Sequence, residues 1–196
     1  MSRQKGDIMR DVLISLKPYY YYLIGENIKK VEVRKSYPKA EDWSKRALFY
    51  MSRDEKSFAK IPKEFQEKYR KHFGKVGMRF VCDRIDRVAS INTPCMDYIE
   101  VNDKWHKYFS ELSYLTVDEL GKYLGYNKYG YGWHITDLVV YDEPRELGEF
   151  THGCPDNVRS CSQCKYSPNG WDCTPIKTAP QSWFFVNATE PRQTAD

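Results

Sequence analysis

The chain has 196 residues, of which 41% are hydrophobic and 30% are charged, and its formal net charge is +4. This composition excludes a disordered or fibrous chain and predicts a globular domain with a hydrophobic core. The sequence contains no apolar run long enough for a signal peptide or a membrane span. We therefore expect a cytoplasmic protein with no membrane partner, whose mild positive charge favours anionic ligands.

The first half of the chain mixes strand and helix patterns. Residues 1–10 are polar and are expected to form a flexible leader. Alternating Val, Ile and Leu predict a strand over 12–16, and the positions of Pro18 and Gly25 predict a short helix between them. A further helix is expected to begin at Pro62. Further strands are predicted over 30–36, 46–52 and 76–90, the last of them bent at Arg84.

The second half continues in the same way. Aromatic residues at helical spacing predict a helix over 103–113, and Thr116 and Glu119 have the spacing of a capping box at the start of another. Strands are predicted over 133–144 and 181–187, followed by a flexible tail over 188–196. This order lacks a βαβ rhythm, so it predicts an α+β fold with a mostly antiparallel, barrel-like sheet in a single domain over 11–187.

One predicted strand, Lys30–Ser36, carries an ordered array of charges. Side chains two apart on a strand share a face, so Lys30, Glu32 and Arg34 lie on one face, opposite Val31 and Val33. Two interpretations are open. The charged face can be a solvated sheet surface, where charges discourage edge-to-edge pairing, or it can be the wall of a pocket that binds a charged ligand.

Four segments, taken together in their order and spacing, resemble the ASCH family of PUA-like proteins, and in particular the ASCH proteins of phages and prophages. They are LISLKP (13–18), GENIKKVEVRK (25–35), GWHITDLVVYDEPRELGEF (132–150) and APQSWFFV (179–186). The resemblance implies a small β-barrel with helices packed at its ends. It also implies a cleft associated with RNA or modified nucleotides.

The family signature Gly-x-Lys-x-x-Glu-x-Arg maps onto Lys29, Glu32 and Arg34, with an insertion at 27–28 after Gly-Glu. The resemblance implies that these residues line the nucleic-acid cleft. Arg34 would hold a phosphate or a base edge through its fork of donors, and Glu32 would orient Arg34 or accept from an exocyclic amine. Lys17 and Lys29 would add positive charge at the rim.

Two other functions stay open. Some bacterial family members are amidohydrolases that act on an acylated cytidine and use a Thr nucleophile three residues after the Lys. Glu32 stands at that position, and a carboxylate cannot replace the hydroxyl, so this activity is not carried over. A nuclease or another nucleobase-directed hydrolase would use Lys29, Glu32 and His134 as acid–base groups. Alternatively, a phage anti-defence protein would bind a host protein, or its nucleic acid, through tyrosine-rich surface.

Two further pairs of residues are candidates for the cleft. Trp133 and His134 open a predicted strand, where they serve either as core packing or as a stacking residue and a hydrogen-bonding residue. Gln181 and Ser182 begin the last strand and have the same two interpretations. All four are retained as candidate nucleic-acid-binding residues.

Four of the six Cys residues lie close together, within a segment expected to be an insertion at about 151–175. They are Cys154, Cys161, Cys164 and Cys173. The C-x2-C pair has the spacing at which a tight turn presents two thiolates to one zinc ion, and Gly and Pro residues supply turns around it. We therefore predict a structural zinc with four Cys ligands. The other interpretation is a loop of reduced thiols or occasional disulfides.

Overall fold

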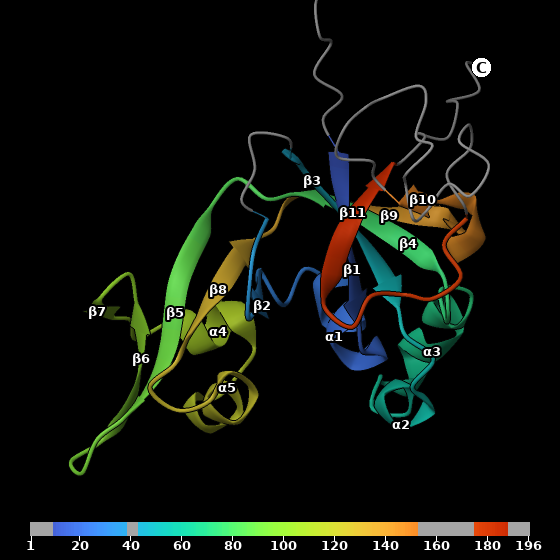
Figure 1. The fold of residues 1–196 in the computed structure, drawn as a ribbon. Helices are drawn as coiled ribbons and strands as arrows, with labels where there is room; N and C mark the ends of the chain where they lie inside the picture. The colour runs from blue at the N-terminus through green and yellow to red at the C-terminus, as the bar shows by residue number, and fades with distance from the viewer. Residues whose placement is uncertain (1–9, 39–42, 153–174, 188–196) are drawn as a thin grey trace, which may run out of the picture.

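The computed structural model describes residues 10–38, 43–152 and 175–187 (Figure 1). The strands are β1 (Arg10–Leu16), β2 (Val31–Arg34), β3 (Trp43–Met51), β4 (Val76–Val81), β5 (Ile85–Asn92), β6 (Asp97–Val101), β7 (Lys104–Trp105), β8 (Tyr129–His134), β9 (Thr136–Arg145), β10 (Thr151–His152) and β11 (Trp183–Asn187). The helices are α1 (Pro18–Gly25), α2 (Glu55–Phe58), α3 (Lys63–Arg70), α4 (Phe109–Ser113), α5 (Val117–Leu124) and the 3-10 turn η1 (Leu147–Glu149).

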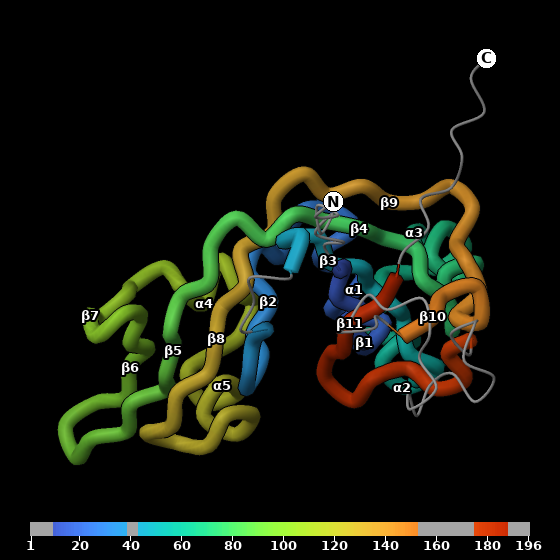
Figure 2. Tube along the Cα trace, turned by 45° about the horizontal axis from the view of Figure 1, so that its top comes forward, coloured from blue at the N-terminus to red at the C-terminus, as the bar shows by residue number. Residues whose placement is uncertain are grey.

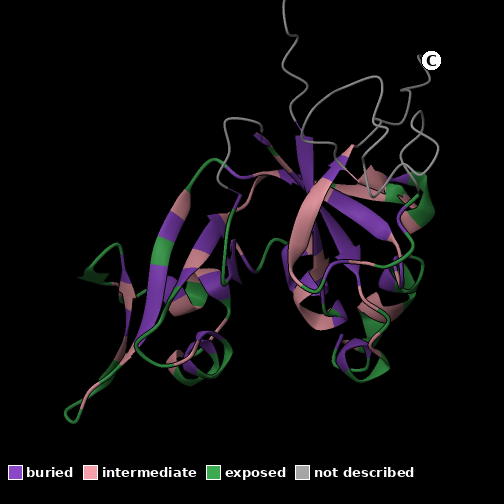
Figure 3. Ribbon diagram, viewed as in Figure 1, coloured by how far each residue is buried: buried purple, intermediate pink, exposed green. Residues whose placement is uncertain are grey.

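The larger sheet has six strands in the order β10-β11-β1-β3-β4-β9. Strands β1 and β3 are parallel and the other neighbours are antiparallel. Strand β1 lies inside the sheet and most of its residues are buried, which explains its run of Val, Leu and Ile (Figure 3). No pairing among the described residues joins β9 to β10, so the mixed α+β class is confirmed but a closed barrel is not.

The smaller sheet has five strands in the order β2-β8-β5-β6-β7. Helices α4 and α5 cover one face of it, where Phe109 and Leu120 pack on the buried valines of β2 and β5 (Figure 1). The glycines of β8 permit this close approach. A Cβ atom at Gly132 would lie 3.0 Å from Val31 Cγ1 and 3.1 Å from the ring of Phe109, and a Cβ atom at Gly130 would lie 2.5 Å from Leu124.

Several predicted elements are confirmed. Helix α1 begins at Pro18, and the capping box of α5 is present, since Glu119 N donates to Thr116 Oγ1 and Thr116 N donates to the carboxylate of Glu119. The strand predicted over 76–90 is wrong as a single element, because it is β4 and β5, which belong to different sheets and are separated at residues 82–84.

The strand predicted over 133–144 is wrong as a single element. It is the end of β8 followed by β9, and these strands belong to different sheets (Figure 2). Ile135 is the point at which the chain passes from one sheet to the other, and Trp133 packs against the core of the larger sheet. None of the helices in the described part of the chain has the length and apolar character needed to span a membrane.

Candidate functional site

A pocket of about 550 Å³ lies where α1 and the end of β1 approach β2 and α5. Five of the residues that line it were predicted from the sequence, which are Lys17, Lys29, Glu32, Arg34 and Gln181. They come from the end of β1, from β2 and the residues before it, and from the segment before β11. The fold therefore brings together residues that are far apart in the sequence.

The deepest part of this pocket is an array of two cations and one carboxylate, Lys29, Glu32 and Arg34. Lys29 Nζ lies 3.4 Å from Glu32 Oε2, and Arg34 Nη2 lies 3.1 Å from Glu32 Oε1. The three side chains are only 1%, 7% and 10% exposed. The interpretation of this strand face as a solvated sheet surface is therefore wrong for Glu32 and Arg34, which form a buried wall of the pocket.

Two backbone carbonyl groups hold the cations of the array in place. Lys29 Nζ donates to the carbonyl oxygen of Ser113, at the end of α4. Arg34 Nη2 donates to the carbonyl oxygen of Ser15 at 2.7 Å, which ties β2 to β1. Burial lowers the pKa of Lys29 and outweighs the opposing effect of Glu32. The array has one more cation than anion, so the pocket suits an anionic ligand.

One donor of the array lacks a partner. Arg34 Nε is shielded from solvent and has no hydrogen-bond acceptor among the described residues. Buried donors of this kind are rare, because each one costs the free energy of its lost hydration. A ligand cannot reach the shielded Nε in this conformation, so it would contact Arg34 through the part of the side chain that is exposed to the pocket.

The rim of the pocket combines exposed cations with tyrosines. Lys17 is exposed, and Lys122 reaches the rim from α5 while paired with Asp118 at 2.6 Å. The ring of Tyr20 lies 5.5 Å from Lys29 Nζ, and Tyr123 lines the opposite side. Positive charge and aromatic rings are thus present at one opening.

The α5 side of the pocket was not predicted from the sequence. Glu119, Lys122 and Tyr123 follow the i, i+3, i+4 spacing that places side chains on one helix face, and this signal was available. It could not be used, because nothing in the local pattern indicates that this face of α5 approaches β2.

The remaining predicted residues lie outside the pocket or at its margin. Trp133 is fully buried, with its ring centroid 5.3 Å from that of Trp43, so it packs in the core and is not accessible for stacking on a base. The backbone carbonyl of Ser182 accepts from Ser15 N at 3.4 Å, and only its neighbour Gln181 lines the pocket.

His134 belongs to a separate polar cluster with Asp86 and Arg84. His134 Nε2 lies 2.7 Å from Asp86 Oδ2, and Arg84 Nη2 lies 2.9 Å from the same imidazole nitrogen. Burial opposes ionisation of Asp86, but hydrogen bonds from Asn102 and His134 outweigh it and lower the pKa of this carboxyl. Since none of these residues lines the pocket, the geometry gives His134 no acid–base role there.

The four Cys residues of the predicted zinc site, 154, 161, 164 and 173, lie outside the described residues. Within the described part of the chain, no cluster of three or more His, Cys, Asp and Glu side chains could hold a metal ion. The zinc site therefore stays a prediction from the sequence.

We expect about one zinc ion per chain, because four thiolates close a tetrahedral site. Elemental analysis of protein purified without chelator measures it. Replacing both Cys161 and Cys164 by Ser should remove the metal, whereas replacing the exposed Cys95 by Ser should not. Metal-free protein with four freely titratable thiols in this segment would contradict the prediction.

No family model matches the chain, and no curated protein matches it. Among solved structures, the chain is similar to the crystal structure of a serine-to-alanine variant of ZmASCH from Zymomonas mobilis, with 15% sequence identity and a TM-score of 0.50. The match covers 92% of this chain and 90% of that one. The crystal structure of ASCH from the same organism matches with 16% identity and a TM-score of 0.47, over 90% of this chain and 87% of that one. At this sequence identity the likeness concerns the fold alone. By the TM-score of 0.50, the chain has the fold of an ASCH protein.

Proposed function

We propose that the chain binds RNA or a nucleotide in the pocket between α1 and α5. The observation that carries this proposal is the buried array of Lys29, Glu32 and Arg34, which gives the wall of a 550 Å³ pocket a net positive charge. Phosphate groups are bound by Lys and Arg, and tyrosines at the rim supply flat surfaces on which bases stack. The fold likeness and the sequence resemblance to ASCH proteins both agree with this function.

The side chains that line the pocket would contact different parts of the ligand. Lys17 and Lys122 are exposed and would meet the phosphate first. Arg34 would offer the part of its guanidinium that is exposed to the pocket to a phosphate or base acceptor, and Glu32 fixes the orientation of Arg34. Gln181 would hydrogen-bond to a base edge through its amide. The resemblance also supports a phage or prophage origin, with action in the cytoplasm of the host cell.

Replacing Lys17 by Ala tests the proposal without disturbing the fold, because this side chain is exposed. We expect RNA affinity to fall by about 1 kcal/mol and the slope of log affinity against log salt to decrease by about one unit, since one phosphate contact is lost. Fluorescence anisotropy with a labelled eight-nucleotide RNA across a salt series measures both. Lys104→Ala is the matched control, because Lys104 is exposed on β7 and does not line the pocket. Equal affinities and slopes for parent, Lys17→Ala and Lys104→Ala would contradict the proposed site.

An enzymatic function is favoured by one observation. Burial lowers the pKa of Lys29 beside a carboxylate, which is an arrangement that acid–base catalysis uses. A nuclease would cleave the RNA used in the binding experiment, so gel analysis of that RNA after incubation separates the two functions. Intact RNA that is bound in a salt-dependent way supports binding alone.

A further inference from the structure

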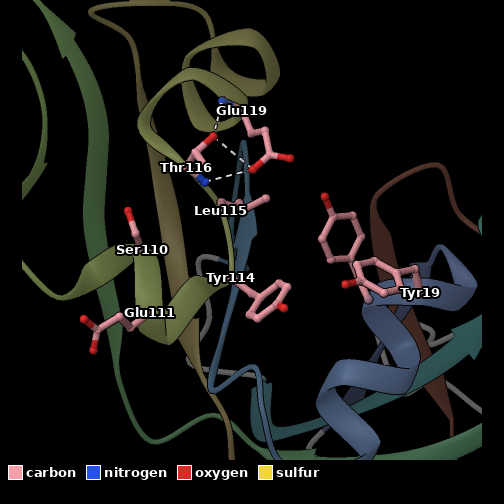
Figure 4. A pocket seen from close by; sticks show the side chains of 8 residues that line it. Tyr19, Ser110, Glu111, Tyr114, Leu115, Thr116 and Glu119 are labelled. Carbon is pink, nitrogen blue, oxygen red and sulfur yellow. Dashed lines mark hydrogen bonds between the residues drawn. The ribbon is translucent and has the colours of Figure 1, made fainter. Parts of the chain in front are cut away.

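A second pocket, of about 420 Å³, adjoins the first and shares Tyr20, Leu115 and Glu119 with it. It lies between the start of α1 and the turn from α4 to α5 (Figure 4). Its other lining residues are Tyr19, Ser110, Glu111, Tyr114 and Thr116. The two pockets therefore form neighbouring compartments that meet at Tyr20.

The two compartments differ in charge. The first is lined by four cations, Lys17, Lys29, Arg34 and Lys122, and by two carboxylates, Glu32 and Glu119, so its cations are in excess. The described residues that line the second include three tyrosines and two carboxylates but no Lys or Arg. A phosphate therefore suits the first compartment, and the second suits an uncharged aromatic group that donates hydrogen bonds.

The tyrosines of the second pocket present accessible ring surface. The ring centroids of Tyr19 and Tyr114 lie 6.4 Å apart in an edge-to-face arrangement, and Tyr114 is 44% exposed. Figure 4 shows that these two side chains lie on α1 and at the end of α4. Tyrosine rings of this kind offer stacking surface to nucleobases of any sequence.

Glu119 supplies an acceptor at the junction of the two pockets. Its Oε2 accepts from Thr116 N at 2.9 Å and from Thr116 Oγ1 at 3.0 Å, which completes the cap of α5. Its Oε1 is hydrogen-bonded to no side chain in the described part of the chain. A carboxylate oxygen in this position suits an exocyclic amine of a base, as carboxylates elsewhere accept from the amine of cytosine.

We propose that the second pocket binds the base next to the nucleotide held in the first, so that the ligand is a strand of at least two nucleotides. The base in the second pocket carries an exocyclic amine that donates to Glu119. This inference rests on the proposed function, because it requires a nucleotide in the first pocket. Tyr20 separates the two bound nucleotides, with Lys29 on one side of its ring.

Isothermal titration with the mononucleotide CMP and the dinucleotides pCpC and pUpU tests the inference. Cytosine and uracil have the same ring size, and only cytosine carries the amine. We expect the parent to bind pCpC roughly 5- to 150-fold more tightly than CMP, since one stacked base accounts for a gain of that size. It should bind pUpU more weakly than pCpC. Tyr114→Asn should remove most of the gain of pCpC over CMP while leaving CMP affinity within about twofold of the parent.

The choice of variants keeps the fold intact. Tyr114 has φ 53°, and Asn tolerates this left-handed conformation better than Ala does. Tyr108→Asn is the matched control, because Tyr108 is 54% exposed, precedes the same helix and lines neither pocket. It should bind all three ligands as the parent does.

The possible failures can be told apart. If the parent binds CMP but gains nothing from pCpC, or if Tyr114→Asn keeps the whole gain, the second pocket is not a base site and the proposed function stands. If pCpC and pUpU bind equally, the role of Glu119 is wrong. If the parent binds none of the three ligands, the proposed function is overturned and this inference with it.

Discussion

Replacing Glu32 by Gln is expected to destabilise the fold by about 3–5 kcal/mol, because it leaves Lys29 and Arg34 buried without the carboxylate between them. Gln keeps the size of the side chain, so the change removes charge without creating a cavity. Urea unfolding at pH 7 measures the effect as a lower midpoint at unchanged slope. Glu111→Gln is the matched control, because Glu111 is exposed on α4 and surface changes of this kind usually stay within about 0.5 kcal/mol.

A second substitution identifies the cause of this loss. If the cost comes from a stranded cation, then Lys29→Met in the Glu32→Gln background should recover part of the stability, because it removes a buried charge and keeps the apolar stem. A loss below about 1 kcal/mol for Glu32→Gln would show that water or a solution anion already compensates the array. That result would contradict its description as a buried wall.

The alternation of β2 predicted the valine face of the strand correctly, but it did not predict the burial of Glu32 and Arg34. The inclusion of Lys30 in the array was wrong, because Lys30 precedes β2 and does not line the pocket, and Lys29 pairs with Glu32 instead. Val31 and Val33 lie in the core between the smaller sheet and its helices, as the pattern indicated. The cations of the array are bonded to the backbone carbonyls of Ser15, which is 19 residues from Arg34, and of Ser113, which is 84 residues from Lys29. A strand pattern has period two and carries no information about contacts at such separations.

Because a local pattern carries no information about distant contacts, the passage from β8 to β9 and the strand β8 itself were not predicted. Ile135 separates β8 from β9, and the continuous apolar pattern around it concealed the passage from one sheet to the other. Gly130 and Gly132 of β8 weakened the strand signal, although their small size is what allows α4 and α5 to pack closely. Local signals with a direct physical mechanism, such as the capping box at Thr116, were confirmed.

His72 should make the stability of the protein depend on pH. It is 1% exposed, and its Nδ1 is hydrogen-bonded to the hydroxyl of Tyr21 at 2.9 Å. Burial, together with the charges of Lys71 and Lys68, lowers the pKa of His72 from 6.5 to about 4. The native state therefore keeps this ring neutral in mildly acidic solution, where the unfolded chain protonates it.

The direction of the effect follows from the protons bound in each state. Above pH 6.5 neither the native nor the unfolded state binds the proton, so His72 does not lower the free energy of unfolding. As the pH falls from 6.5 to about 4, only the unfolded state gains the proton, so stability is lost through this window. Between pH 7.5 and pH 5 the loss from this one residue should be about 2 kcal/mol.

Urea unfolding of the parent and of His72→Gln at pH 7.5 and pH 5 measures this loss. The difference between the two proteins removes the contribution of the carboxylates, because both proteins contain them. The variant is expected to be less stable at pH 7.5, and its stability should fall by about 2 kcal/mol less than that of the parent between the two pH values. Tyr21→Phe removes the hydroxyl and leaves the His72 ring buried beside Lys71 and Lys68. Since burial is the larger cause, Tyr21→Phe should retain the pH dependence of the parent. Equal pH dependence in the parent and His72→Gln would show that the buried ring accepts a proton in the native state as readily as in the unfolded chain.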